Sequence, residues 1–484
     1  MIKSTKVEEK SNLKKGIMTV IALTCIKNVT SPIWTMGVIN IYFLSYLHYY
    51  QSFITKQYQY FFNFILYSSF YFFAPLSAFL DKKIGPQKVI LLEGILLMIS
   101  SIIFYISKNI FIYYFSMLIV GIAGTIGASI ISKHTAVYFP KKKGLINSIG
   151  ETVGAFGSSL TTFFSEKIIN YNSVSVYKDD DGKVKNKEDI GFYPKDIANN
   201  ILKFFILQFF LYFIFISLTL IFFYPIKNFN IDINQESKLN EDIENLSNEK
   251  LLSNDGELEN QDFLKENDNN DNELETINDN EKRKKIKTKI LKSNRIIKLM
   301  IISLFSNFTL KLVFNSYRQL VTEFDITNIE EKYSQFIGNV AFFFVCINCL
   351  LFGAIVDKYS FKFLSSIITL TGIFVGFFYS FSFNNNYLFV IFTLLITIIN
   401  GGNLVVLSTH IMKCFPIDYY IEIESFLKVP GGISNLVISP FIVLMTSIFS
   451  NKLLGYILMY GFGGLLAFIA FILVLTEGEN SFKV

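Results

Sequence analysis

Cysteine and charge are both scarce in this chain of 484 residues. The four cysteines, Cys25, Cys346, Cys349 and Cys414, are too few for a disulfide framework at this length. Charged residues make up only 17% of the sequence, against roughly 25% in a typical soluble domain. Together these shortages exclude a disordered chain and a small disulfide scaffold, and they disfavour a soluble two-domain enzyme.

Motifs of the common catalytic chemistries are missing as well. The sequence has no P-loop, nucleophile elbow or dinucleotide fingerprint in a suitable context. Cys346 and Cys349 are three residues apart but have no nearby histidine, so they predict small packing residues rather than a zinc site. We therefore expect no enzyme, no cofactor and no metal.

Apolar sequence, by contrast, is abundant. Hydrophobic residues make up 51% of the chain, and a helix that crosses a bilayer needs about 20 of them. The apolar runs are too long for strands and lack a two-residue alternation, which favours helices over a β-barrel. Twelve transmembrane helices are predicted, at 16–47, 59–80, 88–106, 110–138, 143–169, 199–226, 299–321, 333–356, 361–382, 386–412, 424–449 and 453–476. The expected fold class is an all-α polytopic membrane protein.

Lysines gather in the even-numbered connections between these segments. Because cytosolic loops carry an excess of Lys and Arg, both termini and the even-numbered loops are expected in the cytosol of a plasma-membrane or organelle-membrane protein. The lysines that give this signal are Lys82, Lys83, Lys88, Lys141, Lys142, Lys143, Lys358 and Lys362.

The central connection differs in composition from the rest of the chain. Residues 231–281 contain 17 acidic and 3 basic side chains, a net charge of −14, so the formal total of +5 leaves +19 elsewhere. With little apolar surface to offset chain entropy, this stretch is predicted to be disordered. The nine Lys or Arg residues of 282–298 indicate either a contact with anionic lipid or nucleotide, or a topology signal.

These observations divide the chain into five parts. They are a cytosolic tail at 1–15, a six-helix bundle at 16–226, a cytosolic loop at 227–298, a second six-helix bundle at 299–476 and a cytosolic tail at 477–484.

The two predicted bundles share two short motifs. LSAFLDKK (76–83) matches FGAIVDKY (352–359), and SKHTAVYFP (132–140) matches STHIMKCFP (408–416). Both matches have an offset of 276 residues, which places Asp81 over Asp357 and His134 over His410. The repeats therefore have the same orientation in the membrane. Two parallel six-helix repeats with a central linker resemble the major facilitator superfamily.

The stretch APLSAFLDKKIGPQKV resembles that superfamily's motif in the loop between helices 2 and 3. There, a carboxylate at a helix end pairs with cations or a helix N-terminus in one transporter state and releases them in the other. The resemblance implies gating roles for Asp81, Lys82, Lys83, Gly85, Asp357 and Lys358.

Within the superfamily, the first half resembles the monocarboxylate and oxalate–formate exchanger branch. PIWTMGVINIYFLSYL and YFPKKKGLINSIGETVGAFGSSL follow the branch's order, and INGGNLVVLSTH also fits. Cys349 stands where monocarboxylate carriers usually have an Arg in helix 8. The high content of Asn, Lys, Ile and Phe is typical of an AT-rich genome, such as that of an apicomplexan parasite.

Ionisable residues inside a membrane default to functional hypotheses. Lys311 lies roughly 18 Å into its helix, near the bilayer midplane, so it is expected to bind a substrate carboxylate with Ser306, Asn307 and Asn315 beside it. Lys27 and Lys428 are further candidates, with snorkelling and an interfacial salt bridge as their alternatives. Glu151 predicts either an ion pair or a proton-coupling group. His134 and His410 predict either a proton-linked gate or helix-end hydrogen bonds.

The resulting hypothesis is a monomeric secondary transporter that moves a small organic anion by alternating access. A proton or a counter-substrate would supply the coupling, and no nucleic acid would be involved. One alternative is an amino-acid transporter with Lys311 on the carboxylate and Glu151 on the amine. Another is a non-transporting membrane sensor that signals through the acidic loop.

Overall fold

The computed structural model describes residues 2–55, 58–172, 174, 176, 192–226, 285–324, 331–449 and 452–478. Within these ranges, the side chains of 2–10, 32–38, 59, 60, 63, 315–324, 331–336, 339, 384, 439, 446 and 452 lie outside the description. Residues 1–224 and 294–483 form one compact unit, and residues 225–293 belong to a second. In the second unit, helix covers residues 285–291. The acidic stretch 231–281 lies outside the described residues.

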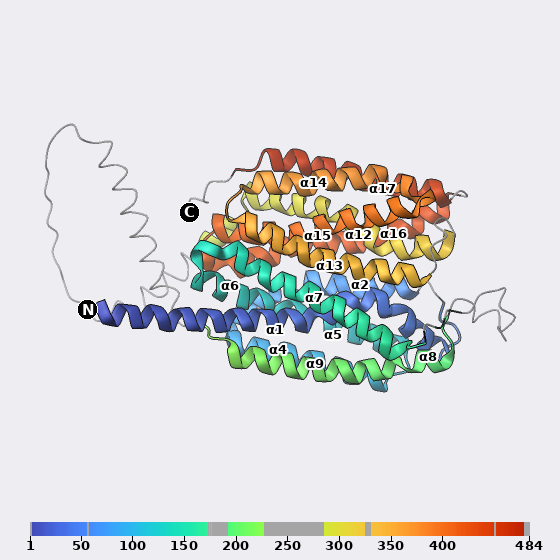
Figure 1. The fold of residues 1–484 in the computed structure, drawn as a ribbon, viewed down its shortest axis with the longest axis horizontal. Helices are drawn as coiled ribbons and strands as arrows, with labels where there is room; N and C mark the ends of the chain where they lie inside the picture. The colour runs from blue at the N-terminus through green and yellow to red at the C-terminus, as the bar shows by residue number, and fades with distance from the viewer. Residues whose placement is uncertain are drawn as a thin grey trace. The chain divides into compact units, whose positions relative to one another are not determined.

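The compact unit is all-helical, and its helices run alongside one another (Figure 1). The first half comprises α1 (Ile2–His48), α2 (Tyr58–Phe72), α3 (Pro75–Ile84), α4 (Pro86–Ile106), α5 (Ile110–Ile126), α6 (Ala128–Tyr138), η1 (Pro140–Lys142), α7 (Lys143–Ile169), α8 (Lys195–Asn199) and α9 (Ile201–Phe222). The second half comprises α12 (Asn294–Phe324), α13 (Glu331–Val356), α14 (Phe361–Phe378), η4 (Tyr379–Asn384), α15 (Asn386–Cys414), η5 (Ile417–Tyr419), α16 (Tyr420–Ile448) and α17 (Lys452–Leu475).

Helix occupies each of the twelve predicted segments, but not every segment is one straight span. Among the described residues, eight helices are long and apolar enough to cross a membrane, or nine if one bent pair counts as a span. That pair is α2 and α3, which meet at 51°, because Pro75 at the start of α3 cannot continue the hydrogen-bond ladder of α2. The segment at 110–138 is likewise divided, at Gly127, into α5 and α6.

The start of the first helix differs from the prediction. The sequence predicts a helix from residue 16, whereas α1 begins at Ile2. Residues 2–15 contain neither Gly nor Pro and are rich in Lys and Glu, which are good helix formers even where the sequence is too polar for a membrane.

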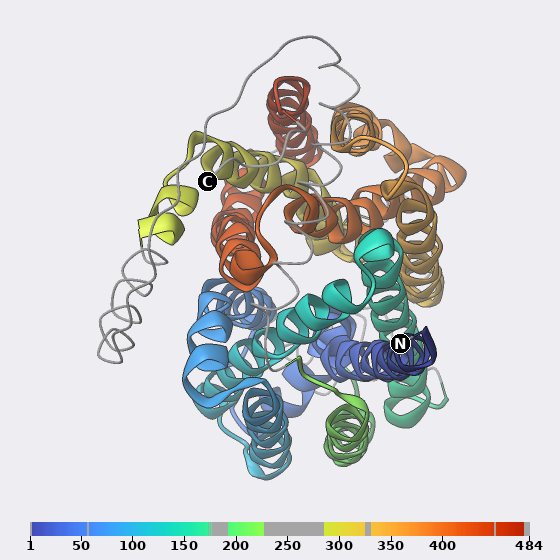
Figure 2. The same ribbon diagram turned by 90° about the vertical axis from the view of Figure 1, so that its left-hand side faces the viewer.

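The two halves lie side by side when viewed along the helices (Figure 2). Their main contacts are α7 with α13 and α2 with α16. Small residues permit the first contact, because a Cβ on Gly353 of α13 would lie 1.8 Å from Ser148 Oγ of α7. These four helices therefore form the boundary at which one half meets the other.

One end of the unit collects the junctions α3–α4, α6–α7, α13–α14 and α15–α16, together with the start of α12. Asp357, Lys413 and Lys143 connect the α6–α7, α13–α14 and α15–α16 junctions by hydrogen bonds. We call it the basic end, because the lysines of the predicted even-numbered loops lie in these junctions. It is on the left in Figure 1. The paired motifs of the sequence repeat all lie there.

Candidate functional site

Lys311 on α12 lies at the boundary between the halves. Its Nζ donates hydrogen bonds to the Gly431 carbonyl oxygen (2.6 Å) and to Ser434 Oγ (2.9 Å), both on α16. The same ammonium lies 4.5 Å from the ring centroid of Tyr71, which belongs to α2 in the other half. Among the described residues, no carboxylate pairs with Lys311. The ammonium is therefore held by neutral groups alone.

A second cation lies on α1. Lys27 Nζ is 2.5 Å from Glu151 Oε1 of α7, and both side chains are 15% exposed. Glu151 is thus in an ion pair in this structure. Gly154, one turn along α7, allows the helices to approach, because a Cβ there would already lie 3.3 Å from Lys27 Cβ.

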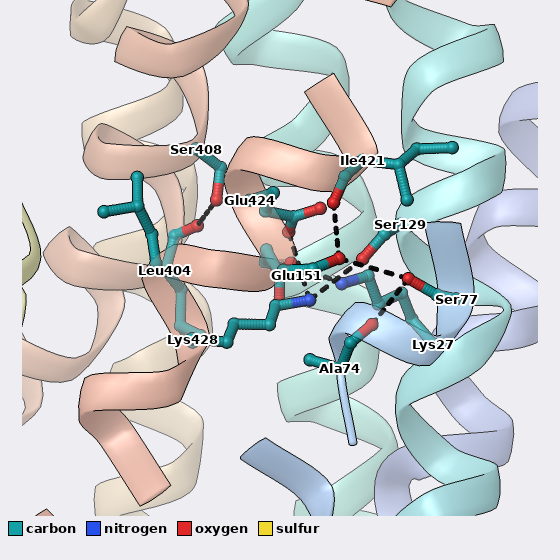
Figure 3. Close-up of polar contacts among 12 residues, drawn as sticks. Lys27, Ala74, Ser77, Ser129, Glu151, Leu404, Ser408, Ile421, Glu424 and Lys428 are labelled. Atoms are coloured by element: carbon teal, nitrogen blue, oxygen red, sulfur yellow. Dashed lines mark hydrogen bonds and ion pairs between the residues drawn. The ribbon is translucent and has the colours of Figure 1, made fainter. Parts of the chain in front are cut away.

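The third cation, Lys428, connects the halves. It forms an ion pair with Glu424 on its own helix, α16, at 3.2 Å. It also donates a hydrogen bond to Ser129 Oγ of α6, at 2.9 Å. Figure 3 shows these groups beside the Lys27–Glu151 pair, and Lys27 and Glu424 interact electrostatically.

We call Lys27, Glu151, Lys311, Glu424 and Lys428 the central charge cluster. Lys428 lies one helical turn before Gly431, the carbonyl that Lys311 contacts. The charge of Glu151 also acts on Tyr71, over which Lys311 lies. With three ammonium groups and two carboxylates, the cluster has one positive charge in excess.

The residues predicted to lie beside Lys311 differ in the hydrogen bonds that they form. Asn307 Oδ1 accepts a hydrogen bond from Asn403 Nδ2 of α15 (3.1 Å), and Asn307 Nδ2 donates to the Ser303 carbonyl (2.8 Å). Ser306 Oγ is buried and has no hydrogen-bond partner among the described residues. The side chain of Asn315 lies outside the described residues.

At the basic end, Asp357 binds the start of a helix from the other half. Its carboxylate accepts hydrogen bonds from the backbone amides of Gly144 (3.2 Å) and Leu145 (3.1 Å), in the first turn of α7. The unpaired amides of a helix N-terminus favour negative charge. Lys413 pairs with the same carboxylate at 3.3 Å, and Lys143 donates to the Met412 carbonyl at 3.2 Å.

The first copy of the loop motif makes different contacts. Lys82 on α3 forms an ion pair with Glu422 on α16, which also connects the halves. Asp81 interacts electrostatically with Lys133 and Glu422. Gly85 has φ +84, a conformation that favours glycine, and it forms the turn from α3 into α4.

The remaining motif lysines lie at the surface of the basic end. Lys83 is exposed and lies 5.6 Å from the Phe79 ring centroid. Lys358 is exposed as well.

Both repeat-related histidines are buried at the basic end. The His134 ring lies edge-on to Phe223. His410 stacks on Phe361 at 3.9 Å, and its Nε2 lies 3.4 Å from Arg295 Nη2. Neither histidine belongs to the central charge cluster.

Four residues of this region escape sequence reasoning. Tyr71 is one of many aromatics in its segment, and Asn403 is one of many asparagines in the chain. Ser434 follows the Pro430-Gly-Gly break, which is a usable signal for exposed helix carbonyls. Glu93, an acidic residue inside an apolar segment, carries the same signal that identifies Lys311.

Comparison with known proteins shows the same fold in several transporters. The human organic anion transporter MFSD10 (TETRAN) superposes with a TM-score of 0.61 at 11% identity, covering 95% of this chain and 99% of that chain. The transporter FucP in its outward conformation gives 0.62 at 10% identity, covering 94% and 98%. The proton:xylose symporter XylE gives 0.59 at 13% identity, covering 98% of each. These identities show likeness of fold alone.

A curated relative matches over a shorter range. The probable nitrate transporter NarT of Staphylococcus haemolyticus is 28% identical over 100 residues, which are 21% of this chain and 25% of that protein. The match therefore spans about a quarter of the relative's length.

The family model of the Major Facilitator Superfamily matches residues 33–420, most of the chain. The apolar helices of this chain, and the fold that the chain shares with known transporters, agree with that match. The chain belongs to the Major Facilitator Superfamily and is an integral, multi-pass membrane transporter rather than an enzyme.

Proposed function

We propose that the chain is a secondary active transporter that moves a small organic anion across a membrane by alternating access. The observation that carries this proposal is the buried ammonium of Lys311, which has no carboxylate partner among the described residues. An ammonium within a membrane is costly without an anionic partner. Among the described residues, the Lys311 ammonium contacts Gly431, Ser434 and Tyr71. A substrate carboxylate supplies the missing charge.

A monocarboxylate fits this chemistry. Lys311 is a single point charge with three donors, two of which already have acceptors in the protein. One donor remains for a carboxylate oxygen. Nitrate, the substrate in the name of the partial relative, is a planar anion with similar acceptor oxygens, and it is the second candidate substrate.

The contacts at the basic end support alternating access. Lys82 with Glu422, and Asp357 with the start of α7, each join one half to the other. Such contacts hold one end closed and must separate for that end to open. By the positive-inside rule, we assign the basic end to the cytosol.

The amino-acid alternative needs Glu151 for the substrate amine. Lys27 already holds that carboxylate at 2.5 Å, which favours an anion over a zwitterion. The sensor alternative depends on residues 231–281, outside the described residues, and it predicts ligand binding without flux.

The test is uptake of radiolabelled lactate, formate and nitrate by proteoliposomes that contain the wild type or Lys311→Ala. A hydrogen bond to a charged group contributes about 1.5–3 kcal/mol. The apparent affinity of Lys311→Ala should therefore fall about tenfold or more.

Lys108→Ala is the matched control. It removes an exposed ammonium that lies 4.3 Å from the Tyr50 ring centroid, at the other end of the unit, and should transport as the wild type does. Equal uptake and affinity in Lys311→Ala and wild type would remove Lys311 from the site. Binding without uptake in the wild type would favour the sensor.

A further inference from the structure

Glu93 on α4 is a carboxyl group that the anion site does not use. Its side chain is fully buried, with 0% exposure. Among the described residues, neither carboxyl oxygen has a side-chain hydrogen-bond partner, and the backbone amide of Gly127 is the polar group that acts on the carboxyl. Buried polar groups are nearly always hydrogen-bonded, so an unsatisfied one requires an explanation.

The carboxyl lies against the break between α5 and α6. A Cβ on Gly127 would lie 2.0 Å from Glu93 Oε2 and 3.7 Å from Ile26 Cδ1 of α1. Only a glycine at the break leaves room for the carboxyl. The chain between α5 and α6 therefore leaves space for the Glu93 side chain.

Two titratable groups face Glu93 from the neighbouring helices. The charge of Lys27, on α1, acts on the Glu93 carboxyl. Glu93 acts in turn on the Tyr212 hydroxyl of α9, which accepts a hydrogen bond from Gln208 at 2.5 Å. Among the described residues, Lys27 is the cation of this group, and its Nζ contacts Glu151 instead.

Burying an ionised carboxylate in such a place costs far more free energy than burying the protonated form, which carries no charge. The geometry therefore suits a group that holds a proton while Lys27 is engaged with Glu151. Because Lys27 belongs to the central charge cluster, the proton also decides the cluster's net charge.

We propose that Glu93 is the proton-binding group of the transporter, and that its proton moves together with the substrate anion. The inference rests on the proposed anion transport. With Glu93 protonated, the central charge cluster keeps one excess positive charge and binds an anion. When Glu93 releases the proton, its carboxylate cancels that charge and the anion dissociates. Proton and anion thus favour each other's binding, as linkage requires.

The first test does not depend on the substrate. Infrared difference spectra of purified protein at low and high pH should show the carbonyl band of a buried protonated carboxyl in the wild type. The band should be missing in Glu93→Gln, in which an amide of the same size replaces the acid, and present in the control Glu166→Gln. A wild type without the band, or a band that remains in Glu93→Gln, would overturn the proposal.

The second test separates coupling from transport in proteoliposomes. Proteoliposomes with the wild type should accumulate lactate, formate or nitrate when their lumen is more alkaline than the outer medium. The affinity for the anion should fall by up to about tenfold per pH unit as Glu93 loses its proton. Glu93→Gln should keep anion exchange, lose accumulation driven by the pH gradient, and bind with an affinity that does not change with pH. Glu93→Asp should restore the pH dependence.

Each outcome has a distinct meaning. If Glu93→Gln still accumulates anion in response to a pH gradient, the proton-binding role is wrong while the anion site stands. If Glu93→Gln loses exchange as well, the carboxyl serves the structure rather than the coupling. If wild-type protein shows the infrared band but transports no anion, the proposed substrate class is wrong.

Discussion

In the Lys27–Glu151 pair, each buried charge is stabilised by the opposite charge of its partner. Both side chains are 15% exposed, so removal of one leaves the other mostly buried without compensation. Breaking a buried pair typically costs about 3–5 kcal/mol, whereas removing both charges is often close to neutral.

We expect Lys27→Met to lower the unfolding temperature of the detergent-purified protein more than the double variant Lys27→Met with Glu151→Gln. Thermal unfolding of the two single variants and the double variant gives the coupling energy directly. Additive losses, with the double variant the least stable, would show that the two charges do not depend on each other.

The central cations are predictable from the sequence because an ionisable residue in an apolar run stands out. Lys27, Lys311 and Lys428 all lie at the site. Their neutral neighbours are not predictable, because Tyr71 and Ser434 approach Lys311 only through the bend between α2 and α3 and the course of α16. Glu93 carries the same signal as these cations, because it is an acidic residue inside the predicted apolar segment 88–106.

At the scale of elements, the backbones of α14 and α17 approach each other closely. A Cβ on Gly376 would lie 2.4 Å from the Cα of Gly464, a backbone atom that cannot rotate away. Gly461, also on α17, would place a Cβ in open space. An alanine at Gly376 therefore tests packing between the helices, whereas an alanine at Gly461 tests helix propensity alone.

Gly376→Ala should destabilise the protein by about 1–3 kcal/mol through overpacking, seen as a lower unfolding temperature. Gly461→Ala is the matched control. It should leave stability unchanged or raise it by up to about 1 kcal/mol, since alanine is the better helix former. Equal unfolding temperatures for the two variants would contradict the close approach of α14 and α17.

Element positions follow from the apolar runs, but element breaks do not. The twelve predicted segments all contain helix, whereas the 51° bend between α2 and α3 and the break at Gly127 have no counterpart in the prediction. Hydropathy measures the length of apolar sequence and is insensitive to one Pro or Gly within it. Both breaks nevertheless shape the site, one beside Tyr71 and the other beside Glu93.

At the scale of the whole molecule, the proposed alternating access requires the contacts at the basic end to separate when that end opens. Asp357→Asn removes the charge that the α7 amides and Lys413 share. A loss of about 1.5 kcal/mol should raise the population with an open basic end about tenfold.

Spin labels at Lys88 and Lys362, both exposed and in different halves, measure this opening by pulsed electron paramagnetic resonance. The native cysteines are buried, so introduced cysteines take the label. Asp357→Asn should add a longer distance. Asp196→Asn, which changes an exposed aspartate in the first turn of α8, is the control and should not. An unchanged distance distribution in Asp357→Asn would exclude a gating role for this carboxylate.

The excess charge of the central charge cluster has an electrical consequence. Moving one elementary charge across a membrane changes its energy by about 2.3 kcal/mol per 100 mV. A conformational change that moves an uncompensated ammonium through the membrane would therefore be opposed or favoured by the membrane potential. A bound anion cancels that charge on the loaded journey, and an ionised Glu93 cancels it on the empty return. Under the proposed coupling of proton and anion, the protein would therefore turn over without passing current, whatever the membrane potential.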